Sequence, residues 1–184
     1  MDLLAFSHGQ TQSKQWLCEN LEPYLPNKAT IAILGSWYNI LGFMILTRNH
    51  NRCQSILGID IDPDAIKVAD QICQGWMIGS DTQLKNELGD ADTYNLQGFN
   101  VVINCSPEHM DSNDWFDNID PGALVCIQTS NMDLNDDIWK VTNPNRTLDE
   151  FAKKYPLSHT LVSLTKDIAY DTWGYQRYMI IGIK

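Results

Sequence analysis

Two residues of the sequence combine in a way that could bind a nucleoside. Gly35 follows the apolar segment 30–34, and Asp60 follows the apolar segment 55–59. Glycine allows a sharp turn and lets a ligand approach the backbone closely. Asp60 lies about 25 residues after Gly35, near the offset at which a carboxylate accepts hydrogen bonds from both ribose hydroxyls of an adenosine cofactor. Alone, the glycine could serve only the turn and Asp60 could be a solvated carboxylate; together they predict a nucleoside-cofactor site.

The residues after Gly35 discriminate between nucleoside cofactors. A dinucleotide site of the G-x-G-x-x-G type needs small residues so that a helix N-terminus can contact the pyrophosphate. Here the turn reads Gly35-Ser36-Trp37-Tyr38, whose aromatic side chains are too bulky for that approach. S-adenosylmethionine has no pyrophosphate and carries a sulfonium cation, which aromatic and acidic neighbours suit. We therefore expect Gly35, Ser36, Trp37 and Tyr38 to bind S-adenosylmethionine, with S-adenosylhomocysteine as the product.

A second group of polar residues follows the apolar segment 101–103. It contains Asn104, Ser106, Glu108 and His109. Catalytic groups of open α/β sheets gather just beyond the strand ends. His109 could take a proton from an attacking oxygen or nitrogen, and Glu108 could orient the imidazole or an amine substrate. A histidine that only packs within a loop is an equally good interpretation, because the sequence identifies no second member of a relay.

Two further segments are rich in groups that stack or form hydrogen bonds. They are residues 6–10 near the N-terminus and the loop 170–175. A packed aromatic cluster is the favoured interpretation of these rings. His8 and Lys14 are retained as possible substrate contacts.

Short apolar segments alternate with helical patterns, which indicates a mostly parallel sheet covered by helices on both faces. Strands are expected at 30–34, 55–59, 84–88, 101–103 and 123–127, followed by an antiparallel pair at 160–166 and 176–183. Helices are expected at 10–25, ended by Pro26, at 39–48, from Asp62-Pro63 onward, and after a capping box that begins at Thr147. The expected fold class is α/β: a three-layer Rossmann-like sandwich with a mostly parallel seven-stranded sheet and an antiparallel C-terminal hairpin strand.

Length and charge set the domain count and the class of partner. The chain has 184 residues and 43% hydrophobic residues, enough for one core. We expect a single domain, 1–184, in which the helical segment 1–28 covers the active site. Its 13 basic and 23 acidic side chains give a formal charge of −10, which repels a phosphate backbone. A small-molecule or protein substrate is therefore favoured over nucleic acid.

The cysteines and the apolar segments indicate a compartment. The five cysteines are odd in number and form no C-x-x-C pair, which favours reduced thiols and no metal site. No apolar run is long enough to span a membrane, and the N-terminus lacks the pattern of a signal peptide. We expect a cytoplasmic protein without a membrane partner.

Residues 30 to 129, with the closing hairpin, resemble the class I S-adenosylmethionine-dependent methyltransferases. The reversed last strand distinguishes that family from nicotinamide-dependent dehydrogenases. The resemblance implies that Gly35 and Ser36 line the methionine part of the cofactor and that Asp60 holds the ribose. Ile61 would then pack on the adenine.

The resemblance extends to two later motifs. Gly89-Asp90-Ala91 is similar to the third motif of the family, in which the acid contacts the adenine amino group, and Asp81 is a competing candidate. Residues 104–107 are similar to the fourth motif, where cofactor and substrate meet. The first motif of the family has closely spaced glycines, whereas here the second glycine, Gly42, comes late.

Three functions are compatible with these residues. The leading hypothesis is a methyltransferase that moves the sulfonium methyl group to an oxygen or nitrogen nucleophile of an unidentified acceptor. Its catalytic candidates are Asn104, Glu108 and His109. A nicotinamide-dependent oxidoreductase is the second hypothesis, and a noncatalytic cofactor-binding or scaffold protein of the same fold is the third.

Overall fold

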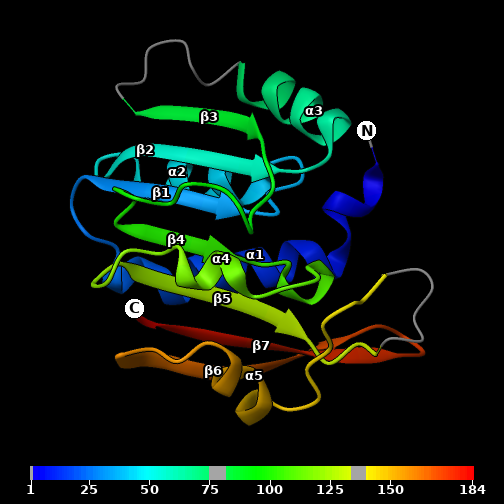
Figure 1. The fold of residues 1–184 in the computed structure, drawn as a ribbon. Helices are drawn as coiled ribbons and strands as arrows, with labels where there is room; N and C mark the ends of the chain where they lie inside the picture. Colours follow the sequence, from blue (N-terminus) through cyan, green and yellow to red (C-terminus); the bar gives the residue numbers. More distant parts are fainter. Residues whose placement is uncertain (1, 75–81, 134–139) are drawn as a thin grey trace.

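The computed structural model describes residues 2–74, 82–133 and 140–184. These residues form one seven-stranded sheet with the strand order β3-β2-β1-β4-β5-β7-β6 (Figure 1). The strands are β1 Ala29–Leu34, β2 Cys53–Asp60, β3 Gln83–Leu88, β4 Val101–Asn104, β5 Leu124–Ser130, β6 His159–Ala169 and β7 Gly174–Ile183. The helices are α1 His8–Leu21, α2 Ile40–Asn49, α3 Pro63–Gln74, α4 Asp114–Asp117 and α5 Leu148–Lys154, with 3-10 turns η1 Leu3–Phe6, η2 Glu22–Tyr24 and η3 Pro107–His109.

The pairing of the strands confirms the expected fold class. Strands β1 to β5 pair in parallel, whereas β7 runs antiparallel to both β5 and β6. After β5, the chain first forms the edge strand β6. It then returns as β7, which lies between β5 and β6. The strand order reverses direction between β1 and β4, and ligands of open α/β sheets bind at the carboxyl ends of the strands at such a point.

Helices cover both faces of the sheet and make the molecule three-layered (Figure 1). A buried apolar cluster lies between the sheet and the helices on each face. On one face, apolar side chains of α1, α2 and α3 pack against the strands. On the other face, Trp115 and Phe116 of α4 and Phe151 of α5 do the same. Trp115 and Phe116 thus anchor the short helix between β4 and β5.

The first helix differs from its expected bounds. It begins at His8, because the Ser7 hydroxyl accepts a hydrogen bond from the Gln10 amide, and it ends at Leu21. Pro23 stands at the start of the following 3-10 turn and has no amide to continue the α-helical pattern. The predicted end at residue 25 was therefore wrong, and Pro23 ends the helix earlier than Pro26 would.

The other expected elements are present with small shifts at their ends. The weakly patterned third strand is confirmed as β3, and β5 continues to Ser130. Thr147 caps α5 through the Glu150 amide, as the capping box predicted, and the Glu150 carboxylate accepts from the Arg146 amide. All five cysteines are free thiols. In the ranges that the structure describes, no helix combines the length and the apolar character needed to cross a bilayer.

Candidate functional site

The turn after β1 holds three residues with left-handed backbone. Gly35, Trp37 and Asn39 have φ values of 58°, 51° and 50°. A left-handed tryptophan costs on the order of 1 kcal/mol, and such conformations persist only where the surroundings fix them. Backbone strain of this kind gathers at ligand-binding sites. The turn that the sequence analysis selected is thus a constrained structure and not a plain connection.

Asp60 holds this turn against the end of β2. One carboxylate oxygen, Oδ2, accepts a hydrogen bond from the Trp37 amide at 2.6 Å, and Oδ1 accepts from the Asp62 amide at 3.0 Å. The Ser36 amide adds a third link by donating to the Ile59 carbonyl at 3.0 Å. A carboxylate has about four acceptor positions, so Asp60 can still bind ligand hydroxyls. The structure therefore brings Gly35 and Asp60 together, as their spacing predicted.

Gly35 and Ser106 are in contact just after the ends of the neighbouring strands β1 and β4. The Ser106 hydroxyl donates to the Gly35 carbonyl at 3.3 Å. A Cβ atom on Gly35 would stand 2.9 Å from the Cβ of Ser106, so the close approach needs glycine as much as the positive φ does. Next to it, the buried Ser36 hydroxyl has no hydrogen-bond partner among the described residues.

The two aromatic residues of the turn have structural contacts of their own. The rings of Trp37 and Tyr38 lie 5.1 Å apart at their centroids. Tyr38 is buried with Ala5 and Ala65, and its hydroxyl accepts from the Asp2 amide at 2.8 Å. Tyr38 therefore ties the N-terminal segment to the turn, whereas Trp37 remains partly accessible.

The residues expected at the adenine lie beside the end of β2. The Gly89 amide donates to the Asp60 carbonyl at 2.9 Å, which places the third motif beside the second strand end. Asp90 is exposed, Ala91 is buried, and Ile61 exposes 71% of its surface. The competing candidate, Asp81, lies outside the described residues.

Asn39 is a residue of the site that the sequence analysis did not select. Its side chain is fully buried, accepts from the Gly42 amide at 3.2 Å and donates to Asn86 at 2.8 Å. A Cβ on Gly42 would come within 2.2 Å of this side chain, and one on Gly58 within 2.5 Å. The late glycine of the first motif therefore makes room for a helix cap. An Asn directly before an apolar helix was the available signal, because Asn is a preferred N-cap residue.

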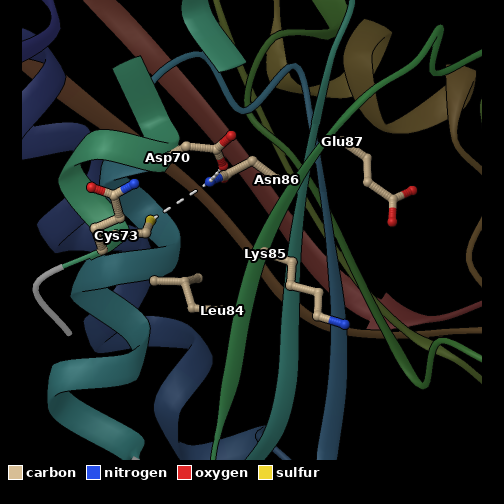
Figure 2. Close-up of a pocket in the computed structure, with 7 residues that line it drawn as sticks. Asp70, Cys73, Leu84, Lys85, Asn86 and Glu87 are labelled. Atoms are coloured by element: carbon tan, nitrogen blue, oxygen red, sulfur yellow. Dashed lines mark hydrogen bonds between the residues drawn. The ribbon is translucent and has the colours of Figure 1, made fainter. Parts of the chain in front are cut away.

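Figure 2 shows Asn86 with its neighbours on the outer side of this network. Its amide donates to Asp70 of α3 at 2.9 Å and contacts the sulfur of Cys73 at 3.7 Å. These residues line an open pocket of about 300 Å³, formed only by α3 and β3. None of the residues expected to bind cofactor lines it, so we assign it no part in the candidate site.

Asn104 ends β4 opposite Leu34 and is fully buried. Its Oδ1 accepts from the Ser106 amide at 2.9 Å, and its Nδ2 lies 3.2 Å from the sulfur of Met110. Both ends of the side chain thus shape the loop that carries Ser106. This arrangement gives Asn104 a positioning role at the junction of β1 and β4.

Glu108 and His109 lie beyond β4, but in different surroundings. Glu108 is 2% exposed, and its Oε1 accepts from Arg177 of β7 at 2.9 Å and from Ser130 of β5 at 3.2 Å. His109 is exposed, and its Nδ1 lies 3.4 Å from the Lys140 carbonyl. The structure therefore separates the two residues that the sequence placed together.

Arg177 and Lys14 complete the polar groups at this edge. The second guanidinium nitrogen of Arg177 donates to the Cys105 carbonyl at 3.2 Å. Lys14 of α1 donates to Gln10, and burial lowers the pKa of Lys14 to about 8, helped by the positive charge of Arg177. Burial also raises the pKa of the Cys105 thiol to about 11, which leaves it protonated and unreactive near neutrality.

The aromatic loop between β6 and β7 forms the packed cluster that was favoured for it. Tyr170 stacks on Trp173 at 4.4 Å and 6°, and the edge of His8 meets Tyr170 at 5.6 Å. The Tyr170 hydroxyl accepts from the Gly9 amide at 3.0 Å. This cluster fixes the first turn of α1 over the polar edge described above.

Solved structures share the fold of this chain. The N-methyltransferase NodS from Bradyrhizobium japonicum WM9 matches with a TM-score of 0.69 and 11% identity, over 95% of this chain and 97% of that one. Magnesium protoporphyrin IX methyltransferase from Synechocystis PCC 6803 with bound SAH matches with a TM-score of 0.70 and 12% identity, over 95% and 83%. The chain has the class I methyltransferase fold.

Other methyltransferase structures agree with this assignment. Geranyl diphosphate C-methyltransferase from Streptomyces coelicolor A3(2), in complex with S-adenosyl-L-homocysteine, matches the methyltransferase fold of this chain with a TM-score of 0.68 and 10% identity, over 95% of this chain and 77% of that one. No family model matches the sequence, and no curated protein matches it. The comparisons therefore rest on the arrangement of the chain in space.

Proposed function

We propose that this protein is an S-adenosylmethionine-dependent methyltransferase that acts on an oxygen or nitrogen nucleophile. The observation that carries the proposal is the 2.6 Å hydrogen bond from the Trp37 amide to the Asp60 carboxylate. It joins the turn that begins at Gly35 to the end of β2. It sets a strained, glycine-bearing turn and a carboxylate side by side at the point where the strand order reverses. A nucleoside with two ribose hydroxyls is the ligand that this pairing suits.

The residues around this junction fit the cofactor. The Ser36 hydroxyl is buried and free to hydrogen bond a polar part of the ligand, such as its methionine group. Asp60 retains acceptor positions for the ribose, Ile61 offers an uncovered apolar surface for the adenine, and Asp90 is exposed beside it for the amino group. S-adenosylmethionine supplies an electrophilic methyl group, so no metal is needed for the transfer.

The same hydrogen bond disfavours a nicotinamide dinucleotide. A pyrophosphate would have to approach backbone amides at the start of the helix after β1. Here the Trp37 amide already donates to the Asp60 carboxylate, whose charge repels a second anion. Binding of NADH in place of S-adenosylhomocysteine would reverse our ranking of the two cofactors.

The chain's own residues supply orientation and proton transfer. Holding two reactants in line accounts for much of the acceleration of such a step. A proton on Nδ1 of His109 would face the Lys140 carbonyl and leave Nε2 free to accept a proton from the acceptor. Glu108, held by Arg177 and Ser130, is suited to orienting an amine or hydroxyl through its remaining oxygen.

The proposal is tested by incubating the full chain with S-adenosylmethionine labelled in its methyl group and with separate metabolite, protein and nucleic-acid pools. We expect label in the metabolite or protein pool, and loss of that transfer in Asp60→Ala. Label confined to nucleic acid would contradict the acceptor class. Cofactor binding without transfer to any pool would favour a noncatalytic binding protein.

The candidate base has its own variant. His109→Gln should slow transfer by about a hundredfold, within the range typical of general-base catalysis, without weakening cofactor binding. Unchanged methyl transfer in this variant would show that His109 is not the base and only packs within its loop.

A further inference from the structure

Side chains from four elements meet at the carboxyl edge of the sheet, beside the candidate cofactor site. Arg177 of β7 binds Glu108 of η3 at 2.9 Å, and Ser130 of β5 binds the same carboxylate oxygen at 3.2 Å. The Gln128 side chain of β5 donates to the carbonyl of Ser13 at 3.1 Å, which places the neighbouring Lys14 of α1 at this edge, and the charges of Lys14 and Arg177 act on each other. We call Lys14, Glu108, Ser130 and Arg177 the polar edge cluster.

The polar edge cluster has unused hydrogen-bonding capacity. The second carboxylate oxygen of Glu108 and the Nε of Arg177 are buried and have no partner among the described residues. Buried polar atoms without partners are rare in native proteins, and a missing ligand is one physical explanation for them.

The charges of the cluster do not balance. It contains two cations, Lys14 and Arg177, and one anion, Glu108, in a chain whose formal charge is −10. Burial opposes the charged form of Lys14, and Arg177 opposes it further, which together lower the pKa of Lys14 to about 8. A bound anion would offset both effects.

We propose that the polar edge cluster is the acceptor subsite of the methyltransferase and that Lys14, with the free Nε of Arg177, binds a carboxylate of a small acceptor. This inference rests on the proposed function. A monoanion neutralises the single excess positive charge, whereas a phosphate dianion would overcompensate it next to the buried Glu108. The unpartnered oxygen of Glu108 is left to accept a hydrogen bond from the acceptor's amine or hydroxyl.

The test uses simple carboxylates as probes, because the acceptor is unidentified. Acetate, propionate, benzoate and phenylacetate are titrated into the full chain saturated with S-adenosylhomocysteine, and binding is followed by calorimetry and by the NMR signals of the Lys14 side chain. We expect at least one carboxylate to bind and to raise the pKa of Lys14. Absence of binding by all four, or equal binding of the neutral amides of these acids, would overturn the proposal.

Three variants separate recognition from folding. Lys14→Met should weaken carboxylate binding by about ten- to a hundredfold, and Lys14→Arg should restore most of it. Lys67→Met removes an exposed lysine of α3 and serves as the matched control, for which no change is expected. Unchanged binding in Lys14→Met, or tighter binding of inorganic phosphate than of every carboxylate, would refute the assignment.

The pH dependence gives an independent readout. The groups that face Lys14 are Arg177, Cys105 and, on its own helix, Cys18, and burial raises the pKa of Cys105 to about 11 and that of Cys18 to about 12. Between pH 7 and 9, about one unit either side of its pKa, Lys14 is therefore the group of this set that loses its charge. Carboxylate affinity should fall over this range in the wild type and stay constant in Lys14→Arg.

The two proposals fail in different ways. Binding of S-adenosylhomocysteine is measured before any probe is added. A chain that binds S-adenosylhomocysteine but no carboxylate keeps the proposed function and loses this subsite. A chain that binds carboxylates through Lys14 but not S-adenosylhomocysteine keeps the anion site and loses its assignment to a methyl acceptor.

Discussion

Asp60 illustrates how one side chain can serve both the fold and a ligand. Its carboxylate fixes the Trp37 amide and the Asp62 amide, so it organises the turn before any cofactor binds. Preorganised hydrogen-bonding groups lose little conformational freedom on binding, which improves affinity. The buried Ser36 hydroxyl is the complementary feature, because it has no hydrogen-bond partner among the described residues and a ligand that supplied one would remove the cost of leaving it unsatisfied.

A substitution of Gly35 tests whether the close contact between the segments after β1 and β4 requires glycine. Gly35→Ala introduces a Cβ at φ 58° and 2.9 Å from the Cβ of Ser106. We expect a loss of about 2–4 kcal/mol in the free energy of unfolding, from backbone strain of roughly 1 kcal/mol and the steric clash. Urea denaturation measures this difference.

Gly98 provides the matched control for that substitution. It also has a positive φ, 84°, but a Cβ there would meet nothing within 4 Å. Gly98→Ala should therefore cost only about 1 kcal/mol, the strain of the backbone alone. Equal losses in the two variants would show that the contact with Ser106 is unimportant.

The buried charge of Lys14 should lower the free energy of unfolding of the ligand-free protein. Its pKa is about 8 in the folded chain and 10.5 in the ordinary state, so below pH 8 the fold buries a charge unfavourably. Lys14→Met should raise the free energy of unfolding at pH 7 by about 1–3 kcal/mol. Between those two pKa values the unfolded chain binds the extra proton, so wild-type stability rises with pH and the advantage of the variant shrinks.

Denaturation of both proteins at pH 7 and at higher pH checks the sign. A variant that is less stable than the wild type at pH 7 would show that the Lys14 stem contributes more through packing than its charge costs. If Lys14→Met is more stable than the wild type but no longer binds carboxylates, Lys14 lowers stability in order to bind the ligand.

At the scale of elements, the side chain of Asn39 connects α2, β2 and β3. It caps α2 through the Gly42 amide, its side chain is fully buried beside Gly58 of β2, and it donates to Asn86 of β3. Asn39→Ala removes the cap and leaves the Asn86 carbonyl without this donor. We expect a loss of about 2–4 kcal/mol, measured by chemical denaturation, from a cap of about 1 kcal/mol and the unsatisfied side-chain oxygen of the half-buried Asn86.

Thr147→Ala separates the two contributions, because Thr147 caps α5 through the Glu150 amide at 3.1 Å on an exposed surface. Its loss should be about 1 kcal/mol, the value of a cap alone. If Asn39→Ala costs no more than Thr147→Ala, the link across β2 to β3 adds nothing to stability.

The elements could be predicted largely because their signals are local. Continuous apolar runs such as 101–103 and 30–34 are buried on both faces of the sheet, and this burial leaves a direct trace in composition. The end of α1 was predicted wrongly, because either proline can stop a helix and the structure uses Pro23 in place of Pro26. The polar sequence of β3 is also consistent with its place at the edge of the sheet.

The candidate site could be predicted only where it depends on single strand ends. Gly35 and Asp60 each end or follow a strand, so their meeting followed from the parallel sheet. The pairing of Glu108 with Arg177 spans 69 positions, and the link between Asn39 and Asn86 spans 47, so neither leaves a local pattern. Such contacts depend on strand order and register, which the sequence analysis did not fix at the residue level.

At the scale of the whole molecule, the sheet places two different ligand environments at one edge. The ends of β1, β2 and β3 carry the turn, Asp60 and Asp90. The polar edge cluster comes from η3 after β4, the end of β5, the start of β7 and the helix α1. The fold thus sets a candidate cofactor site beside a candidate acceptor subsite. The packed aromatic loop and the N-terminal segment, tied by Tyr170 and Tyr38, hold α1 over this edge.

Calorimetric titration of the full chain with S-adenosylhomocysteine tests the central claim most directly. The wild type should bind, and Asp60→Ala should bind about ten- to a hundredfold more weakly, the loss expected for charge-assisted hydrogen bonds. Asp149→Ala, which removes an exposed carboxylate of α5, is the control and should bind as the wild type does. Equal affinities of the wild type and Asp60→Ala, or no binding by the wild type, would contradict the assignment of this turn as the cofactor site.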